Sequence, residues 1–115
     1  MPYLKLNTNI AIGKEQSPQL LNRLSKLMAQ ETGKSERYVM VELEAGKAMS
    51  FGGGTDPLAY LECKSIGLTG AQAKSISKSV SQLLEKELQL APARVYIEFS
   101  DCPAHFWGWN GSTFG

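Results

Sequence analysis

Apolar and polar residues alternate along the first ten positions of the chain. In an extended strand, alternate side chains point to opposite faces, so one face of this segment is largely apolar and the other largely polar. The apolar set is Leu4, Leu6, Thr8 and Ile10, and the polar set is Tyr3, Lys5, Asn7 and Asn9. The pattern predicts a first strand with one face directed toward the core.

The pattern then changes to helical spacing, with apolar residues three or four positions apart. These residues are Leu20, Leu21, Leu24, Leu27 and Met28. Ser17 as the N-cap and Pro18 at the first helical position are expected to begin this helix, and Gly33 to end it in the left-handed conformation. Alternation at Val39, Val41 and Leu43 predicts a second strand, and residues 49–51 a short third one.

The second half of the chain repeats this order of elements. Residues 60–66 are strand-like, and Thr69 and Gln72 have the spacing of a capping box that opens a helix. Apolar positions at helical spacing follow, and Pro92 is expected to end the helix. A strand is predicted over residues 94–99. Its side chains divide between two faces: Val95, Ile97 and Phe99 on one, Tyr96 and Glu98 on the other.

A shift of 57 positions superimposes the two halves, strand on strand and helix on helix. Because each β-α-β crossover is right-handed, both helices should lie on one face of a single sheet. The predicted fold is therefore α/β: duplicated β-α-β units forming a four-stranded mixed sheet, in one domain of residues 1–115. The other sheet face carries Lys5, Asn7, Tyr60, Tyr96 and Glu98, a mixed surface that suggests contact between subunits.

Composition narrows the possible functions. The 115 residues are 43% hydrophobic and 20% charged, as in an ordinary globular domain. Twelve basic residues against 11 acidic ones give no charge pattern typical of binding to nucleic acid or an anionic membrane. Cys63, Cys102 and His105 are too few for a structural zinc site, so neither a metal nor another cofactor is expected. Because the start lacks the pattern of a signal peptide, cytoplasmic residence is expected, with release that needs no signal peptide left open.

Several local features could carry chemistry. Glycines 52–54 lack the Lys-Ser/Thr pair of a phosphate loop and are interpreted as a flexible connector. His105 has no nucleophile at a recognisable spacing. Trp107 and Trp109 are hydrophobic cover for a small core or the wall of an aromatic-binding pocket, and the sequence leaves both interpretations open.

Pro2 is the sharpest candidate for catalysis. Removal of Met1 makes its nitrogen a free secondary amine, and an α-amino group has a reference pKa of about 7.7–8.0. Apolar surroundings or a nearby ammonium group lower that pKa further, because both disfavour the protonated amine. Such an amine is a competent general base near neutral pH.

Six segments together give a resemblance over essentially the whole chain. They are PYLKLNTNI at the start, ETGK from Glu31, MSFGG from Met49, KSIG from Lys64, RVYIEF from Arg94 and GWNGSTFG at the end. In this order and spacing they resemble the macrophage migration inhibitory factor family of the tautomerase superfamily. The resemblance implies a homotrimer with an active site at each subunit interface. It also implies cofactor-free keto–enol tautomerisation of phenylpyruvate-type substrates and isomerisation of dopachrome.

The resemblance assigns a role to each site residue. Pro2 is the general base, Lys34 and the backbone of Ile66 bind the polar end of a small aromatic α-keto acid, Tyr96 approaches from the neighbouring subunit, and Trp109 lines the aromatic ring. The alternative is a secreted, cytokine-like ligand of a cell-surface receptor whose pocket is vestigial.

Three departures from the family pattern bear on specificity. Glu98 replaces a polar amide found in several members, and Trp107 replaces a small aliphatic residue, so both should alter the pocket rim. Leu58 and Leu61 stand where vertebrate members carry a CxxC motif.

Overall fold

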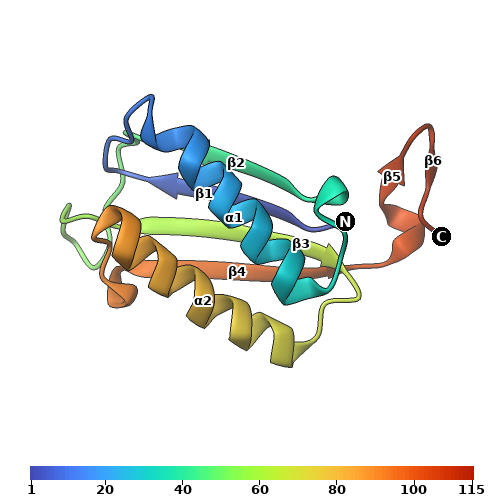
Figure 1. Cartoon of the computed structure of the whole chain (residues 1–115). Coiled ribbons are helices and arrows are strands. Elements are labelled where there is room, and N and C mark those ends of the chain that lie inside the picture. Colours follow the sequence, from blue (N-terminus) through green and yellow to red (C-terminus); the bar gives the residue numbers. More distant parts are fainter.

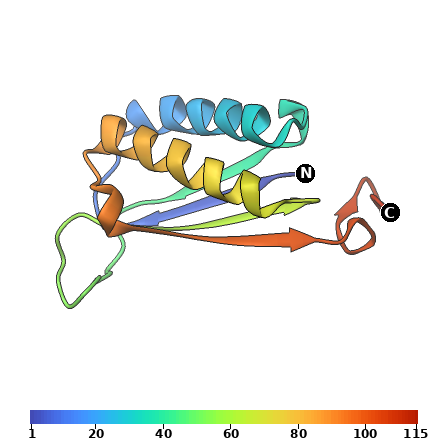
Figure 2. The same cartoon turned by 90° about the horizontal axis from the view of Figure 1, so that it is seen from below.

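Two helices cover one face of a four-stranded sheet, and no layer of this chain covers the other face (Figures 1 and 2). The computed structural model describes residues 1–115. The main elements are β1 (Tyr3–Thr8), α1 (Gln16–Thr32), β2 (Met40–Glu44), β3 (Ala59–Ile66), α2 (Gly70–Leu88) and β4 (Val95–Cys102). Three single-turn 3₁₀ helices and a small hairpin complete the chain: η1 (Glu36–Tyr38), η2 (Pro92–Arg94), η3 (Ala104–Phe106), β5 (Gly108–Trp109) and β6 (Ser112–Thr113).

The strand order confirms the predicted duplication. The sheet runs β2-β1-β3-β4, with parallel pairs β1–β2 and β3–β4 and an antiparallel pair β1–β3 at its centre. Each parallel pair, with its crossover helix, is one β-α-β unit, and the two units join through the central pair. The predicted four-stranded mixed sheet with both helices on one face is therefore correct.

The core lies between this sheet and the helices. Leu4, Leu6 and Thr8 are buried, as the alternation predicted, while Ile10 is half-buried. The Thr8 hydroxyl donates a hydrogen bond to the Leu58 carbonyl at 2.6 Å, so this buried polar group is satisfied. Neither helix combines the length and the apolar character needed to cross a bilayer.

The helix ends agree only in part with the prediction. The capping box forms: the Gln72 amide donates to Thr69 Oγ1 at 3.1 Å, and the Thr69 amide to Gln72 Oε1 at 3.0 Å. Gly33 has the expected positive φ of 69°. The N-cap prediction for Ser17 is wrong, because Ser17 already lies inside α1 and donates both its amide and its hydroxyl to the Gly13 carbonyl.

Two further expectations are corrected near the glycine run and Pro92. α2 ends at Leu88 with Gln89 left-handed, and Pro92 instead begins η2. Residues 49–51 form no third strand; Phe51 makes only an isolated bridge with Gly54. The segment expected to be a flexible connector is tied down by the guanidinium of Arg94, which donates to the carbonyls of Phe51 at 2.8 Å and Asp56 at 2.9 Å.

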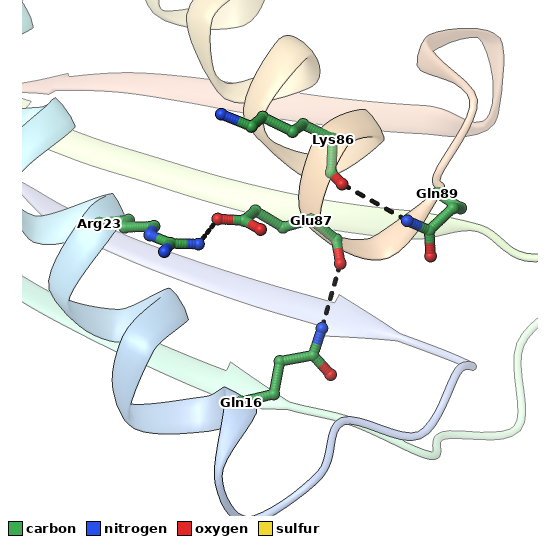
Figure 3. Close-up of polar contacts among 5 residues, drawn as sticks. All are labelled: Gln16, Arg23, Lys86, Glu87 and Gln89. Carbon is green, nitrogen blue, oxygen red and sulfur yellow. Dashed lines mark hydrogen bonds and ion pairs between the residues drawn. The ribbon is translucent and has the colours of Figure 1, made fainter.

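Polar contacts join the two helices near both ends. At the start of α1, Gln16 donates to the Glu87 carbonyl at 3.1 Å and Arg23 pairs with the Glu87 carboxylate (Figure 3). At the end of α1, the Glu31 carboxylate accepts hydrogen bonds from two α2 hydroxyls, Ser75 at 2.6 Å and Ser79 at 2.9 Å. The hydrogen bonds of Glu31 hold the C-terminal end of α1 against α2, and the chain continues from this end to Lys34.

Candidate active site

A cavity of about 360 Å³ opens where the chain begins, next to the C-terminal hairpin. Such a volume lies in the range of small-molecule sites. Pro2 and Tyr3 line it from the start of β1, Tyr38 from η1, Lys64 from β3, and Trp109 from β5. Eight of its 12 lining residues are hydrophobic, so the cavity suits a ligand with a substantial apolar part.

Main-chain geometry places Pro2 in this cavity. Its side chain is buried, and its carbonyl accepts a hydrogen bond from the Met40 amide at 3.0 Å. That bond extends the β1–β2 pairing one residue toward the N-terminus, so the first residues are held against β2. The 3₁₀ turn η1 lies directly before β2 and carries Arg37 and Tyr38 to the same cavity.

Three aromatic rings form one wall. Trp109 stacks on Phe114 with ring centroids 5.4 Å apart and an interplanar angle of 11°. Tyr38 meets Trp109 edge-on at 5.5 Å. The amide of Phe114 donates to the carbonyl of Trp107 at 3.1 Å, which closes the C-terminal segment on itself. Both indoles border the cavity, which favours the pocket-wall interpretation over simple hydrophobic cover.

The charged side chains that line the cavity are both positive. Arg37 and Lys64 are its only charged lining side chains, and no carboxylate lines it. Burial, and secondarily the positive charge of Lys34, lower the pKa of the α-amino group that Met1 carries in the full chain. Lys34 is half-buried and acts on the amine through its field, although it does not line the cavity itself. No group of three or more His, Cys, Asp or Glu side chains is arranged to hold a metal ion.

Besides Lys34, three predicted site residues lie outside this cavity within one chain. Ile66 is half-buried at the end of β3 and does not line it. Tyr96 and Glu98 are exposed on β4, on the open face of the sheet. Tyr96 is in register with Tyr60 and Asn7, whereas Tyr3 pairs with Lys64, which is four residues further along β3. At 3.3 Å per residue, this places Tyr96 about 13 Å along the sheet from the Pro2 end.

Tyr96 instead belongs to a second, smaller cavity at the other end of the sheet. Its ring contacts that of Phe51, with centroids 4.5 Å apart. Together with Met49, Leu58 and Tyr60, these rings border a space of about 320 Å³. The two ends of one subunit therefore carry different groups of the predicted site: Pro2 and the tryptophans at one end, Tyr96 at the other.

Sequence reasoning missed several lining residues. The sequence analysis did not select Tyr38, Arg37 and Phe114 as site residues, and Lys64 entered it only as part of the KSIG segment. Tyr38 ends the 3₁₀ turn η1 before β2, where strand alternation assigns no face to a side chain. The ring contacts that bring together Tyr38 and Phe114, 76 positions apart, leave no local sequence signal.

Comparisons with known proteins identify the family. A model of the macrophage migration inhibitory factor family matches residues 1–115. The chain belongs to this family. A macrophage migration inhibitory factor homolog from Brugia malayi is 40% identical over 116 residues and all of both chains. The macrophage migration inhibitory factor of Meriones unguiculatus is also 40% identical, over 99% of each chain.

Solved structures of family members agree with this fold. The homologue from Prochlorococcus marinus superimposes with a TM-score of 0.93 at 40% identity, over 98% of this chain and 99% of that one. The factor from Trichinella spiralis superimposes with a TM-score of 0.88 at 30% identity, over 97% and 99%. Membership of the macrophage migration inhibitory factor family, within the tautomerase superfamily, supports a function of the tautomerase or cytokine-like kind.

Proposed function

We propose that this protein catalyses the cofactor-free keto–enol tautomerisation of an aromatic α-keto acid, with Pro2 as the general base once Met1 has been removed. The observation that carries the proposal is the position of Pro2, buried at an apolar cavity where an α-amino group has a lowered pKa. A base of lowered pKa is unprotonated at neutral pH and can therefore accept a proton. Dopachrome, whose isomerisation is also a proton transfer, is a second candidate substrate.

The reaction in the keto-to-enol direction needs one proton acceptor and one site for negative charge. The Pro2 nitrogen removes a proton from the carbon between the carbonyl group and the ring. The C–H electrons form the new double bond, and the charge moves to the carbonyl oxygen. A cation beside that oxygen stabilises the charge, a role that suits Lys34 together with the Ile66 backbone. The proton then passes to the oxygen, and Pro2 is regenerated.

Assembly as a homotrimer completes the proposed site. Within one chain Tyr96 is 64% exposed and lies at the opposite end of the sheet from Pro2. A neighbouring copy must therefore supply Tyr96, and with it Glu98, to the Pro2 cavity. The uncovered sheet face supports the same proposal (Figure 2). Light scattering of the protein at micromolar concentration should give three times the chain mass, and a monomer mass would contradict the shared site.

The decisive test compares two samples whose intact mass shows that Met1 is absent or present. With Met1 in place the Pro2 nitrogen is an amide without usable basicity. General-base catalysis contributes about 10²- to 10⁴-fold, so the Met-free sample should convert enol-phenylpyruvate at least about a hundredfold faster. Pro2→Gly keeps a primary amine and should retain part of the rate. Equal rates from both samples would exclude Pro2 and leave Tyr96 and His105 to be tested as the base.

The pH–rate profile adds a second criterion. Because the amine works unprotonated, the rate should rise with pH through its pKa. Burial and Lys34 lower the pKa of the Met1 amine, one residue away, and if they act in the same way on the Pro2 amine the rise should lie below the range of an ordinary α-amino group. Lys34→Gln should move it upward.

The alternative function is that of a cytokine-like ligand for a cell-surface receptor. The observation favouring it is the name of the curated relatives, macrophage migration inhibitory factor. A pure ligand has no need of a working base, so the absence of turnover by the Met-free sample would favour this alternative.

A further inference from the structure

The cavity contains more positive charge than one carboxylate requires. Arg37 and Lys64 both line it, and neither side chain has a salt bridge or a hydrogen bond in the chain. The Arg37 guanidinium lies 5.3 Å from the centre of the Tyr38 ring, a contact that leaves its N–H groups free. Lys34 adds a third positive charge that acts on the amine.

No carboxylate of the chain forms a salt bridge with Arg37 or Lys64. Glu42 lies two residues after the cavity residue Met40 on β2, and its carboxylate accepts a hydrogen bond from the Tyr3 hydroxyl at 2.7 Å. Arg37 and Lys64 are therefore both available to a second anionic group, whereas phenylpyruvate carries only one.

We propose that the preferred substrate is a dianion: an aromatic α-keto acid with a second anionic group at the far end of the molecule, received by Arg37 and Lys64. The inference rests on the proposed tautomerase function and extends it to the class of substrate. In this arrangement Lys34 binds the keto-acid end of the substrate near Pro2, and the aromatic ring lies against Trp109 and Phe114. The second anionic group then contacts Arg37 and Lys64. A guanidinium suits a carboxylate because it can donate two parallel hydrogen bonds to it.

The test uses two probes that differ in one charge. 4-Carboxyphenylpyruvate and its 4-carboxamide analogue have nearly the same shape, so the ratio of their kcat/KM values isolates the effect of the second anion. The ratio should favour the carboxylate by about tenfold in the Met-free protein. It should fall to near one in the double variant Arg37→Gln/Lys64→Gln and fall with added salt, because both cations are solvent-exposed.

A matched control separates local contact from net charge. Lys26→Gln removes one positive charge from the exposed side of α1, away from the cavity, and should leave the ratio unchanged. A ratio near one in the unaltered protein would overturn the inference. A ratio that survives in the double variant, with circular dichroism showing a folded protein, would also overturn it.

Binding is measured independently by the quenching of Trp107 and Trp109 fluorescence on titration with the same two probes. One outcome separates the two proposals: neither probe is converted, but the carboxylate probe binds about tenfold more tightly than the carboxamide and loses this advantage in the double variant. In that case the tautomerase proposal fails, and the inference that the cavity binds a dianion stands. If both probes bind equally and neither is converted, both proposals fail.

Discussion

Arg94 should control the order of the glycine loop, and replacing it tests how that loop is held. Its guanidinium donates to the carbonyls of Phe51 at 2.8 Å and Asp56 at 2.9 Å, with weaker contacts to Gly54 at 3.4 Å and Pro57 at 3.5 Å. It also lies 5.1 Å from the centre of the Phe51 ring. Arg94→Gln removes the charge, the short bonds and this ring contact together.

The expected cost follows from those contacts. A net contribution of about 1 kcal/mol for each short hydrogen bond gives about 2 kcal/mol for local opening of the loop. The cation–π contact at a partly exposed site adds about 0.5 kcal/mol. Since 1.4 kcal/mol corresponds to a factor of ten, protection of the loop amides should fall by about 30- to 60-fold.

Hydrogen exchange at two amides measures this opening directly. Phe51 and Gly54 donate to each other's carbonyls at 2.9 and 3.1 Å, so both amides exchange only when the loop opens. Arg94→Lys, which keeps the charge but not the forked geometry, should give an intermediate loss. Arg23→Gln is the matched control, since it removes a guanidinium from a solvent-exposed ion pair with Glu87 and should leave these amides unchanged. Unchanged protection in Arg94→Gln would refute the argument.

Three further predictions concern single side chains. Cys63 is buried and its pKa is raised to about 11, so under native conditions near pH 8 a thiol reagent should modify Cys102 alone, and both thiols only after unfolding. Because Leu58 and Leu61 stand in place of a CxxC pair, we also expect no insulin-reducing activity. Clear turnover that is lost on Cys63→Ser would contradict this expectation. Glu98→Asn should lower the KM for phenylpyruvate if a neighbouring copy brings Glu98 to the pocket as proposed, because a carboxylate there would repel the substrate; an unchanged or raised KM would mean that Glu98 points away from the pocket. Glu31→Ala should lower the free energy of unfolding in urea by about 2 kcal/mol, since it leaves the Ser75 and Ser79 hydroxyls without their acceptor, whereas Glu31→Gln, which keeps one acceptor oxygen, should lose less.

The sequence predicted the fold well because its elements have strong periodic signals. Leu4 and Leu6 alternate with polar residues, and Ile76 and Val80 recur at helical spacing, so strands and helices could be read from local spacing alone. The duplication then determined the sheet. Gly33 and the Thr69–Gln72 box marked helix ends because their effect lies in the backbone of the same few residues.

The incorrect predictions depend on contacts between distant positions. The glycine loop is ordered by Arg94, 43 residues after Phe51. The wall of the cavity forms only when Tyr38 meets Trp109 and Phe114 across the whole chain. None of these contacts produces a pattern in a short window of sequence.

The open sheet face carries Tyr96, and the proposed activity needs this residue at the Pro2 cavity of another subunit. Strands hold their register, so Tyr96 stays level with Asn7 and cannot approach Pro2 by any change of rotamer. Pro2, by contrast, is held in place by Met40 within one chain, and Lys34 of the same chain lowers the pKa of the adjacent Met1 amine. Dilution that dissociates the proposed trimer should therefore reduce the activity per chain to the level of a Tyr96→Phe variant or below.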